Sequence, residues 1–319
     1  MADSNHLRIG FFGTSDFALD ALTTLFEQSS IDIKFVVSQN PKPSGRGQKV
    51  NFSPVYDFAK FHNLNTFTPE NINNLEFINK IKNFEIDFLI IVAYGKIINE
   101  RILKLPKLFS LNIHASILPK WRGAAPIQRS ILNGDDETGI SIIVVEPKLD
   151  SGPIVLSKKI KIDRNEDSGS LHKKLSTLGS KLILEAICKI ANNNYTLIKQ
   201  DEAKSSYAKK ISKTETKISW MSSAESIHRM VRAFTPWPGA WTYWKKEEKK
   251  IRFKVLQSEI IEKFNENSIC LDIGQSDMNL IVKCKKNYLK LKKVQLEGKK
   301  VISGDEFING FKLKNYNFD

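Results

Sequence analysis

The stretch from Leu7 to Phe26, "LRIGFFGTSDFALDALTTLF", decides the fold class of this chain. A mostly apolar run comes first, a glycine turn follows, and apolar residues then recur at helical spacing. This order predicts a strand, a tight turn and a helix that is capped near Ser15 or Asp16. A strand that leads through a short turn into a helix is the first half of a βαβ unit.

The same alternation continues through the first half of the chain. Further apolar runs rich in β-branched residues lie at 31–38, 86–94, 110–116 and 138–147. Helical patterns occur at 54–62, 72–84, 125–134 and 169–190. Strands that alternate with helices predict an α/β domain with a mostly parallel sheet. In such a sheet, ligands bind outside the carboxyl ends of the strands.

The last third of the chain has a different pattern. A polar segment without periodicity, 191–210, predicts a linker between a first domain at 1–190 and a second at 211–319. Beyond a helical pattern at 223–234, short alternating segments separated by turn residues predict a small β-barrel. Ser303 and Glu306 have the spacing of a capping box for a last helix.

Composition excludes several classes of protein. Of the 319 residues, 41% are hydrophobic and 26% are charged, which is ordinary for a globular chain. The apolar runs are too short to span a membrane, and the first residues lack a targeting pattern, so we expect a cytoplasmic location. The three cysteines are far apart and the histidines are scattered, so we expect no disulfide framework and no metal site.

Positive charge is concentrated near the end of the chain. Residues 201–319 hold 24 Lys and Arg against 15 Asp and Glu, a net +9 of the formal +14. A basic domain beside a nearly balanced one indicates a polyanionic partner, most commonly nucleic acid. The alternative is a general enrichment in lysine with no such partner.

One segment carries polar residues that a buried strand does not need. Asn112 and His114 are two residues apart within 110–116, so both side chains point to the same face of the sheet. Asp150 directly follows another predicted strand. If these strand ends meet, His can carry a proton, Asp can orient the imidazole, and Asn can donate to a developing oxyanion. The alternative is a hydrogen-bonded structural histidine.

These residues lie in motifs that are similar to a known family. "NIHASILP", 112–119, with "LDSGPI", 149–154, resembles the folate-dependent formyltransferases. Three further segments, "PKPSGRGQK", "PKWRGAAPIQRSILNGDDETGIS" and "RAFTPWPGAW", resemble the methionyl-tRNA formyltransferases within that group. The resemblance implies a Rossmann-like first domain, a linker and a second domain that is a β-barrel of OB type.

The resemblance also implies an activity. The reaction is transfer of a formyl group from 10-formyltetrahydrofolate to the methionine of charged initiator tRNA, without a metal. Position by position, Asn112, His114 and Asp150 match the catalytic residues, and Ser116, Ile117, Leu118 and Pro119 match the turn that contacts folate. Ile117 stands where the family usually has Leu, and Ala115 where Gly is common. These departures concern the exact shape of the turn and not the chemistry. We expect the chain to act as a monomer.

Contacts to tRNA are expected at basic residues outside this turn. Arg46, between two glycines and flanked by Lys42 and Lys49, lies in a segment that can form a mobile arm gripping phosphate. Arg122 follows the folate turn and can bind phosphate, although a structural salt bridge is an equal alternative. A flexible surface loop is the alternative for the arm.

Three other functions remain open on the sequence. A glycinamide ribonucleotide formyltransferase would share the Asn, His and Asp but not the basic last third. A sugar-nucleotide formyltransferase would share "PWPGA" but not the "SGRGQK" arm. The third is a catalytically inactive RNA-binding relative, and the presence of Asn112, His114 and Asp150 argues against it.

Overall fold

The computed structural model describes residues 6–44, 49–246, 249–262, 273–276, 279–310 and 316–318. The chain divides into two compact units. The first comprises Met1–Gly123, Thr138–Ile160 and His172–Tyr207, and the second comprises Ala124–Glu137, Lys161–Leu171 and Ala208–Asp319. Most of the segment expected to be a linker, up to Tyr207, therefore belongs to the first unit.

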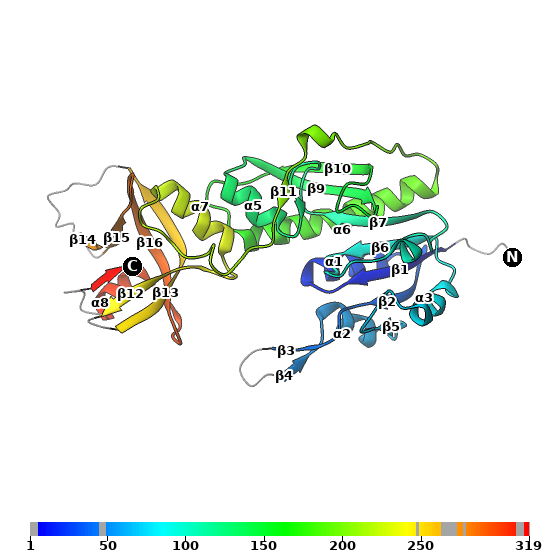
Figure 1. The fold of residues 1–319 in the computed structure, drawn as a ribbon, viewed down its shortest axis with the longest axis horizontal. Helices are drawn as coiled ribbons and strands as arrows, with labels where there is room; N and C mark the ends of the chain where they lie inside the picture. The colour runs from blue at the N-terminus through cyan, green and yellow to red at the C-terminus, as the bar shows by residue number, and fades with distance from the viewer. Residues whose placement is uncertain are drawn as a thin grey trace. The chain divides into compact units, whose positions relative to one another are not determined.

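The first unit is built on one seven-stranded sheet in the order β10-β9-β7-β6-β1-β2-β5 (Figure 1). The neighbours β7-β6-β1-β2-β5 pair in parallel, whereas β9 runs antiparallel to β7. The predicted α/β class with a mostly parallel sheet is thus confirmed. In sheet order the strands are Ile154–Lys161, Glu137–Val144, Phe109–His114, Phe88–Val92, Leu7–Gly13, Ile31–Val37 and Thr66–Phe67.

Helices of the first unit begin where the sequence places caps. Helix α1 starts directly after Ser15, and the side chains of Ser53 and Asn74 accept the backbone N–H groups that open α2 and α3. The long helix α6 continues from the second unit into the first. The helices are α1 Asp16–Phe26, α2 Pro54–Phe61, α3 Leu75–Lys82, α4 Glu100–Leu103 and α6 Ser168–Ala191, with a 3-10 turn at Glu202–Lys204.

The central strands carry the core of this unit. Strand β6 is buried along its whole length, as expected for a strand covered on both faces. Phe12, Phe35 and Leu89 are fully buried in one cluster with the apolar face of α3. Burial of the sheet fixes the register of β7, so the residues at its carboxyl end project at a defined place.

A short hairpin follows the second strand of the sheet. Strands β3 (Lys42–Ser44) and β4 (Lys49–Asn51) pair antiparallel, with Ser44 opposite Lys49. The sequence pattern does not predict this hairpin, because two prolines and two glycines obscure any alternation. Arg46 lies outside the described residues.

The second unit contains an antiparallel sheet in the order β14-β15-β16-β13-β12-β18, with β17 paired to β16. Strands β14 and β18, at the two ends of this path, contact each other, so the sheet is strongly curled. The predicted second β domain is confirmed. The strands are β12 Ala240–Lys246, β13 Lys249–Ile261, β14 Ile273–Ser276, β15 Asn279–Lys283, β16 Tyr288–Leu296, β17 Val301–Ser303 and β18 Tyr316–Phe318.

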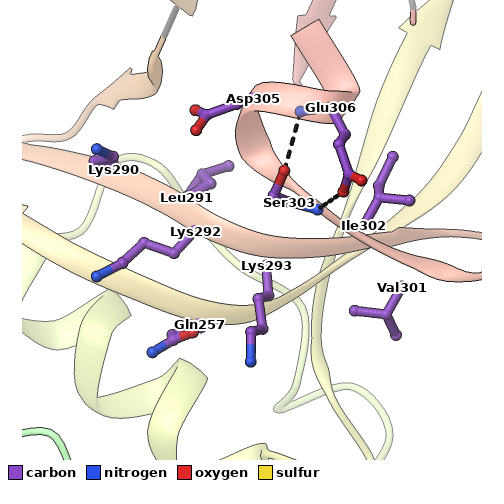
Figure 2. Close-up of a pocket in the computed structure, with 10 residues that line it drawn as sticks. All are labelled: Gln257, Lys290, Leu291, Lys292, Lys293, Val301, Ile302, Ser303, Asp305 and Glu306. Atoms are coloured by element: carbon purple, nitrogen blue, oxygen red, sulfur yellow. Dashed lines mark hydrogen bonds between the residues drawn. The ribbon is translucent and has the colours of Figure 1, made fainter. Parts of the chain in front are cut away.

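Helices α5 (Pro126–Asn133), α7 (Ala224–Phe234) and α8 (Gly304–Gly310) complete the second unit. At α8, Ser303 Oγ accepts from the Glu306 N–H at 3.1 Å, and the Ser303 N–H donates to Glu306 Oε2 at 2.7 Å. Both bonds are drawn in Figure 2, and they confirm the predicted capping box. None of the helices in the described part of the chain is both long and apolar enough to cross a membrane.

Candidate active site

The site lies at the carboxyl end of strand β7. Asn112 and His114 are both on this strand, two residues apart, so they lie on one face of the sheet. Asn112 is half-buried, and in the register of the sheet it lies opposite Ile91 on β6 and Ile143 on β9. Within the described residues, the Asn112 side-chain amide has no hydrogen-bond partner. The amide is therefore open to a ligand.

The His114 ring lies between two acceptor oxygens. Its Nε2 is 2.8 Å from the backbone carbonyl oxygen of Trp121, and its Nδ1 is 3.5 Å from Asp150 Oδ2. Because a carbonyl only accepts, Nε2 carries a hydrogen and donates a hydrogen bond to the Trp121 oxygen. Nδ1 then faces the Asp150 carboxylate. His114 and Asp150 thus lie next to each other, as predicted from the sequence. Only 6% of the His114 side chain and 14% of the Asp150 side chain are exposed.

The backbone that carries both partners of His114 is in an uncommon conformation. Trp121 and Asp150 have positive φ angles of 62° and 48°, a region that residues other than glycine rarely adopt. Such conformations persist where the surrounding contacts hold them, and they gather at functional sites. One such contact is the Gly123 N–H, which donates to Asp150 Oδ2 at 2.8 Å. Asp150 is thus bound to the loop that contains Trp121.

The turn expected to contact folate is tied to strand β9. Ser116 is buried, and its Oγ donates to the Lys120 carbonyl at 2.6 Å. Ser141 on β9 donates to the Ser116 carbonyl at 2.8 Å and accepts from the Leu118 N–H at 3.1 Å. The Leu118 side chain packs in a small apolar cluster, whereas Ile117 and Pro119 are only partly buried. A ligand can therefore contact the backbone of the turn and the side chains of Ile117 and Pro119 more readily than the buried side chains of Ser116 and Leu118.

The Arg122 side chain lies in the interior of the first unit. Its side chain is fully buried, and its Nε and one terminal nitrogen donate to Gln200 Oε1 at 3.0 and 2.8 Å. The same terminal nitrogen is 2.8 Å from Glu202 Oε1. Hydrogen bonds from Arg122 and Lys148 lower the pKa of Glu202 to about 2. The structure speaks against the predicted tRNA contact of Arg122 and favours the salt bridge that was its alternative.

Replacing Arg122 with methionine should therefore reduce stability. Loss of the guanidinium leaves the buried Gln200 Oε1 without a donor, which costs about 1–3 kcal/mol. Urea unfolding measures the change, and Arg101→Met, at an exposed arginine of α4, is the control with an expected change within about 0.5 kcal/mol. Unchanged stability together with weaker tRNA binding would restore Arg122 as a tRNA contact.

Two family models match almost the whole chain. A formyl transferase model matches residues 7–187, and a model of the formyl transferase C-terminal domain matches residues 210–312. The chain is 41% identical over 308 residues to the methionyl-tRNA formyltransferase of Caldicellulosiruptor saccharolyticus, covering 96% of this chain and 97% of that one. It is 40% identical to that of Dictyoglomus thermophilum, covering 96% and 98%. The chain belongs to the methionyl-tRNA formyltransferase family.

Solved structures share the fold of this methionyl-tRNA formyltransferase family member. A sugar 3N-formyltransferase, crystallised with dTDP and 5-N-formyl-THF, matches with a TM-score of 0.63 at 22% identity, covering 92% of this chain and 99% of that one. The N-formyltransferase of Helicobacter canadensis, in complex with folinic acid and dTDP-3-aminofucose, also has a TM-score of 0.63, at 19% identity, covering 89% and 98%. At these identities the likeness shows the fold alone.

Basic side chains line two hollows in the second unit of this formyltransferase. Lys290, Lys292 and Lys293 project from β16 beside a hollow of about 460 Å³, as Figure 2 shows. A second hollow of about 650 Å³ is lined by Lys292 and Lys293 together with Arg164 and Arg232. Lys292 pairs with Glu259 at 3.4 Å, so part of this charge is balanced. Within the described residues, no cluster of three or more His, Cys, Asp or Glu could hold a metal ion.

Two residues that build the site are not predicted from the sequence. Ser141 connects the turn to β9, and Gln200 contacts both the Asp150 loop and Arg122. Ser141 lies in an apolar strand pattern, where a lone serine has no distinguishing feature. Gln200 lies in the polar segment interpreted as a linker, where periodicity gives no information. Neither position has a local motif that could have identified it.

Proposed function

We propose that this chain transfers the formyl group of 10-formyltetrahydrofolate to the α-amino group of methionine on charged initiator tRNA. The observation that carries the proposal is its full-length similarity to methionyl-tRNA formyltransferases, 41% over 96% of the chain. Because charged tRNA is the acceptor, we place the reaction in the cytoplasm. The products are formylmethionyl-tRNA and tetrahydrofolate.

The chemistry requires two charges to be controlled. Attack of the neutral amine on the formyl carbon forms a C–N bond and places negative charge on the formyl oxygen and positive charge on the nitrogen. Asn112 is suited to donate a hydrogen bond to that oxygen, because its amide is open at the carboxyl end of β7. A donor held in place before the reaction stabilises the charge as it develops.

His114 and Asp150 are suited to move the proton. The 3.5 Å separation of Nδ1 and Oδ2 lets the pair take the proton from the attacking nitrogen as a general base. The pair then returns a proton to the departing nitrogen of tetrahydrofolate when the second C–N bond breaks. The hydrogen bond from Nε2 to the Trp121 carbonyl keeps the ring oriented through both steps.

Folate and tRNA contacts complete the proposal. The turn at Ser116, Ile117, Leu118 and Pro119 is the proposed folate contact, through its backbone and its partly buried side chains. For tRNA we propose Lys42 and Lys49, which lie on the two strands of the hairpin, and Arg46, which lies between them in the sequence. We add the three lysines of β16 that line the first hollow, Lys290, Lys292 and Lys293. Cations spaced along a strand suit a phosphate backbone.

An acceptor assay tests the activity. The protein is incubated with formyltetrahydrofolate and one acceptor: charged initiator tRNA, glycinamide ribonucleotide or an amino-sugar nucleotide. We expect formylation of the tRNA alone, because the second unit supplies the cations that a polyanion requires. The sugar acceptor is the informative comparison, because sugar N-formyltransferases share the fold. Formylation of either small acceptor without tRNA activity would overturn the proposal.

A further inference from the structure

One segment connects the two loops that hold His114. The loop around Trp121 supplies the carbonyl that accepts from Nε2, and the loop around Asp150 supplies the carboxylate beside Nδ1. Residues 198–206 bond to both loops. The Trp121 and Arg122 N–H groups donate to Ser206, and Ile198 pairs with Ile154 through two backbone hydrogen bonds. This segment belongs to the same compact unit as the site.

Gln200 is the buried centre of this connection. Its Nε2 donates to the backbone carbonyls of Asp150 and Gly152 at 2.9 and 2.7 Å. Its Oε1 accepts both hydrogen bonds from Arg122. The side-chain amide thus uses both donor hydrogens and both acceptor positions, which is the full capacity of a glutamine. Only 6% of the residue is exposed, so the amide is largely shielded from water.

The Asp150 loop needs such support. Asp150 has a φ of 48°, and an added Cβ at Gly152 would lie 1.8 Å from the Val144 carbonyl oxygen, so the loop runs tightly against β9. The two Gln200 bonds hold the chain on either side of Ser151. A shift of the loop would move Oδ2 away from both the Gly123 N–H and His114 Nδ1.

We propose that Gln200 is a positioning residue that sets the place of the Asp150 carboxylate against the His114 ring. Through Arg122 it also fixes the loop whose Trp121 carbonyl holds the other nitrogen of the ring. The inference rests on the proposed role of Asp150 in proton transfer, and it gives part of the segment between the two family domains a role in the reaction.

A double-mutant cycle between Gln200→Glu and Asp150→Asn tests this inference. Gln200→Glu keeps an acceptor for Arg122 but replaces the amide donor with a carboxylate oxygen that faces two carbonyls. We expect the single-turnover rate constant for formyl transfer, at saturating formyltetrahydrofolate and charged tRNA, to fall about 10- to 100-fold. In the Asp150→Asn background the same change should cost less than about threefold, because the group that it displaces is already lost.

Gln28→Glu is the matched control. Gln28 also donates its side-chain amide to a backbone carbonyl, that of Thr24 at 3.2 Å, after the end of α1. Its replacement should leave the rate unchanged in both backgrounds. Thermal melting reports whether each variant folds. If Gln200→Glu does not fold, Gln200→Asn takes its place in the cycle, because the amide is kept but is one methylene too short to bridge both loops.

The outcomes separate the two proposals. If Asp150→Asn keeps the parent rate, the proposed role of Asp150 fails and the inference about Gln200 fails with it. If Asp150→Asn is slow but the Gln200 variant slows both backgrounds by the same factor, only the inference is overturned, because Gln200 then acts on stability or on another group. A Gln200 variant that has the parent rate with Asp150 intact also overturns it.

Discussion

The His114→Asn variant is expected to lose formyl transfer by a factor of about 10²–10⁴, the usual contribution of a positioned general acid or base. The ring contacts both the Trp121 carbonyl and the Asp150 carboxylate. Asparagine retains a polar side chain of similar reach but has no group that takes up a proton near neutral pH. The loss should appear in the single-turnover rate constant at saturating concentrations of both substrates.

His62→Asn is the control for this experiment. His62 lies at the end of α2 and packs against Phe26 and Phe58, with ring centroids 4.5 and 4.4 Å away. Its replacement should change the melting temperature slightly and leave the rate constant as in the parent. A His114→Asn enzyme that stays within tenfold of the parent would remove His114 from the catalytic residues.

The helices and strands with a clear pattern of apolar residues were predictable from the sequence. Strand β6 is apolar throughout because both faces of the sheet are covered, and α7 is amphipathic because one face packs on the second unit's sheet. Strand β10 was not predicted. Its residues from Ser157 onward are mostly exposed and rich in lysine, so only its first two residues show the burial that marks a strand. A strand at the edge of a sheet gives a weaker pattern than one at its centre.

Some residues of the site were predictable from the sequence and others were not. The strand period predicted that Asn112 and His114 share a face, and the order of strands brought Asp150 to the same edge. Arg122 shows the limit, because the sequence around an arginine does not tell whether its side chain binds phosphate or a buried partner such as Gln200. Gln200 and Ser141 act through hydrogen bonds to backbone groups distant in sequence, and no local pattern encodes such bonds.

The Asn112→Ala variant should lose about 10²–10³ in the rate of formyl transfer, as for removal of one positioned donor to an oxyanion. The loss should be equal in kcat and in kcat/KM, because the bond strengthens only when charge develops on the formyl oxygen. Steady-state kinetics with varied tRNA and saturating formyltetrahydrofolate separate the two parameters. An increase in KM alone would instead assign Asn112 to substrate binding.

Ser110→Ala supplies the control on the same strand and face. Ser110 is buried two residues before Asn112, and its hydroxyl donates to the Leu103 carbonyl at 2.7 Å, away from the carboxyl end of β7. Its loss should lower the free energy of unfolding by about 1 kcal/mol and leave kcat unchanged. The effects differ because Ser110 is already bonded within the fold, whereas the Asn112 amide is open to a ligand. If both variants lost activity equally, the cause would be a shift of β7 and not the loss of an oxyanion donor.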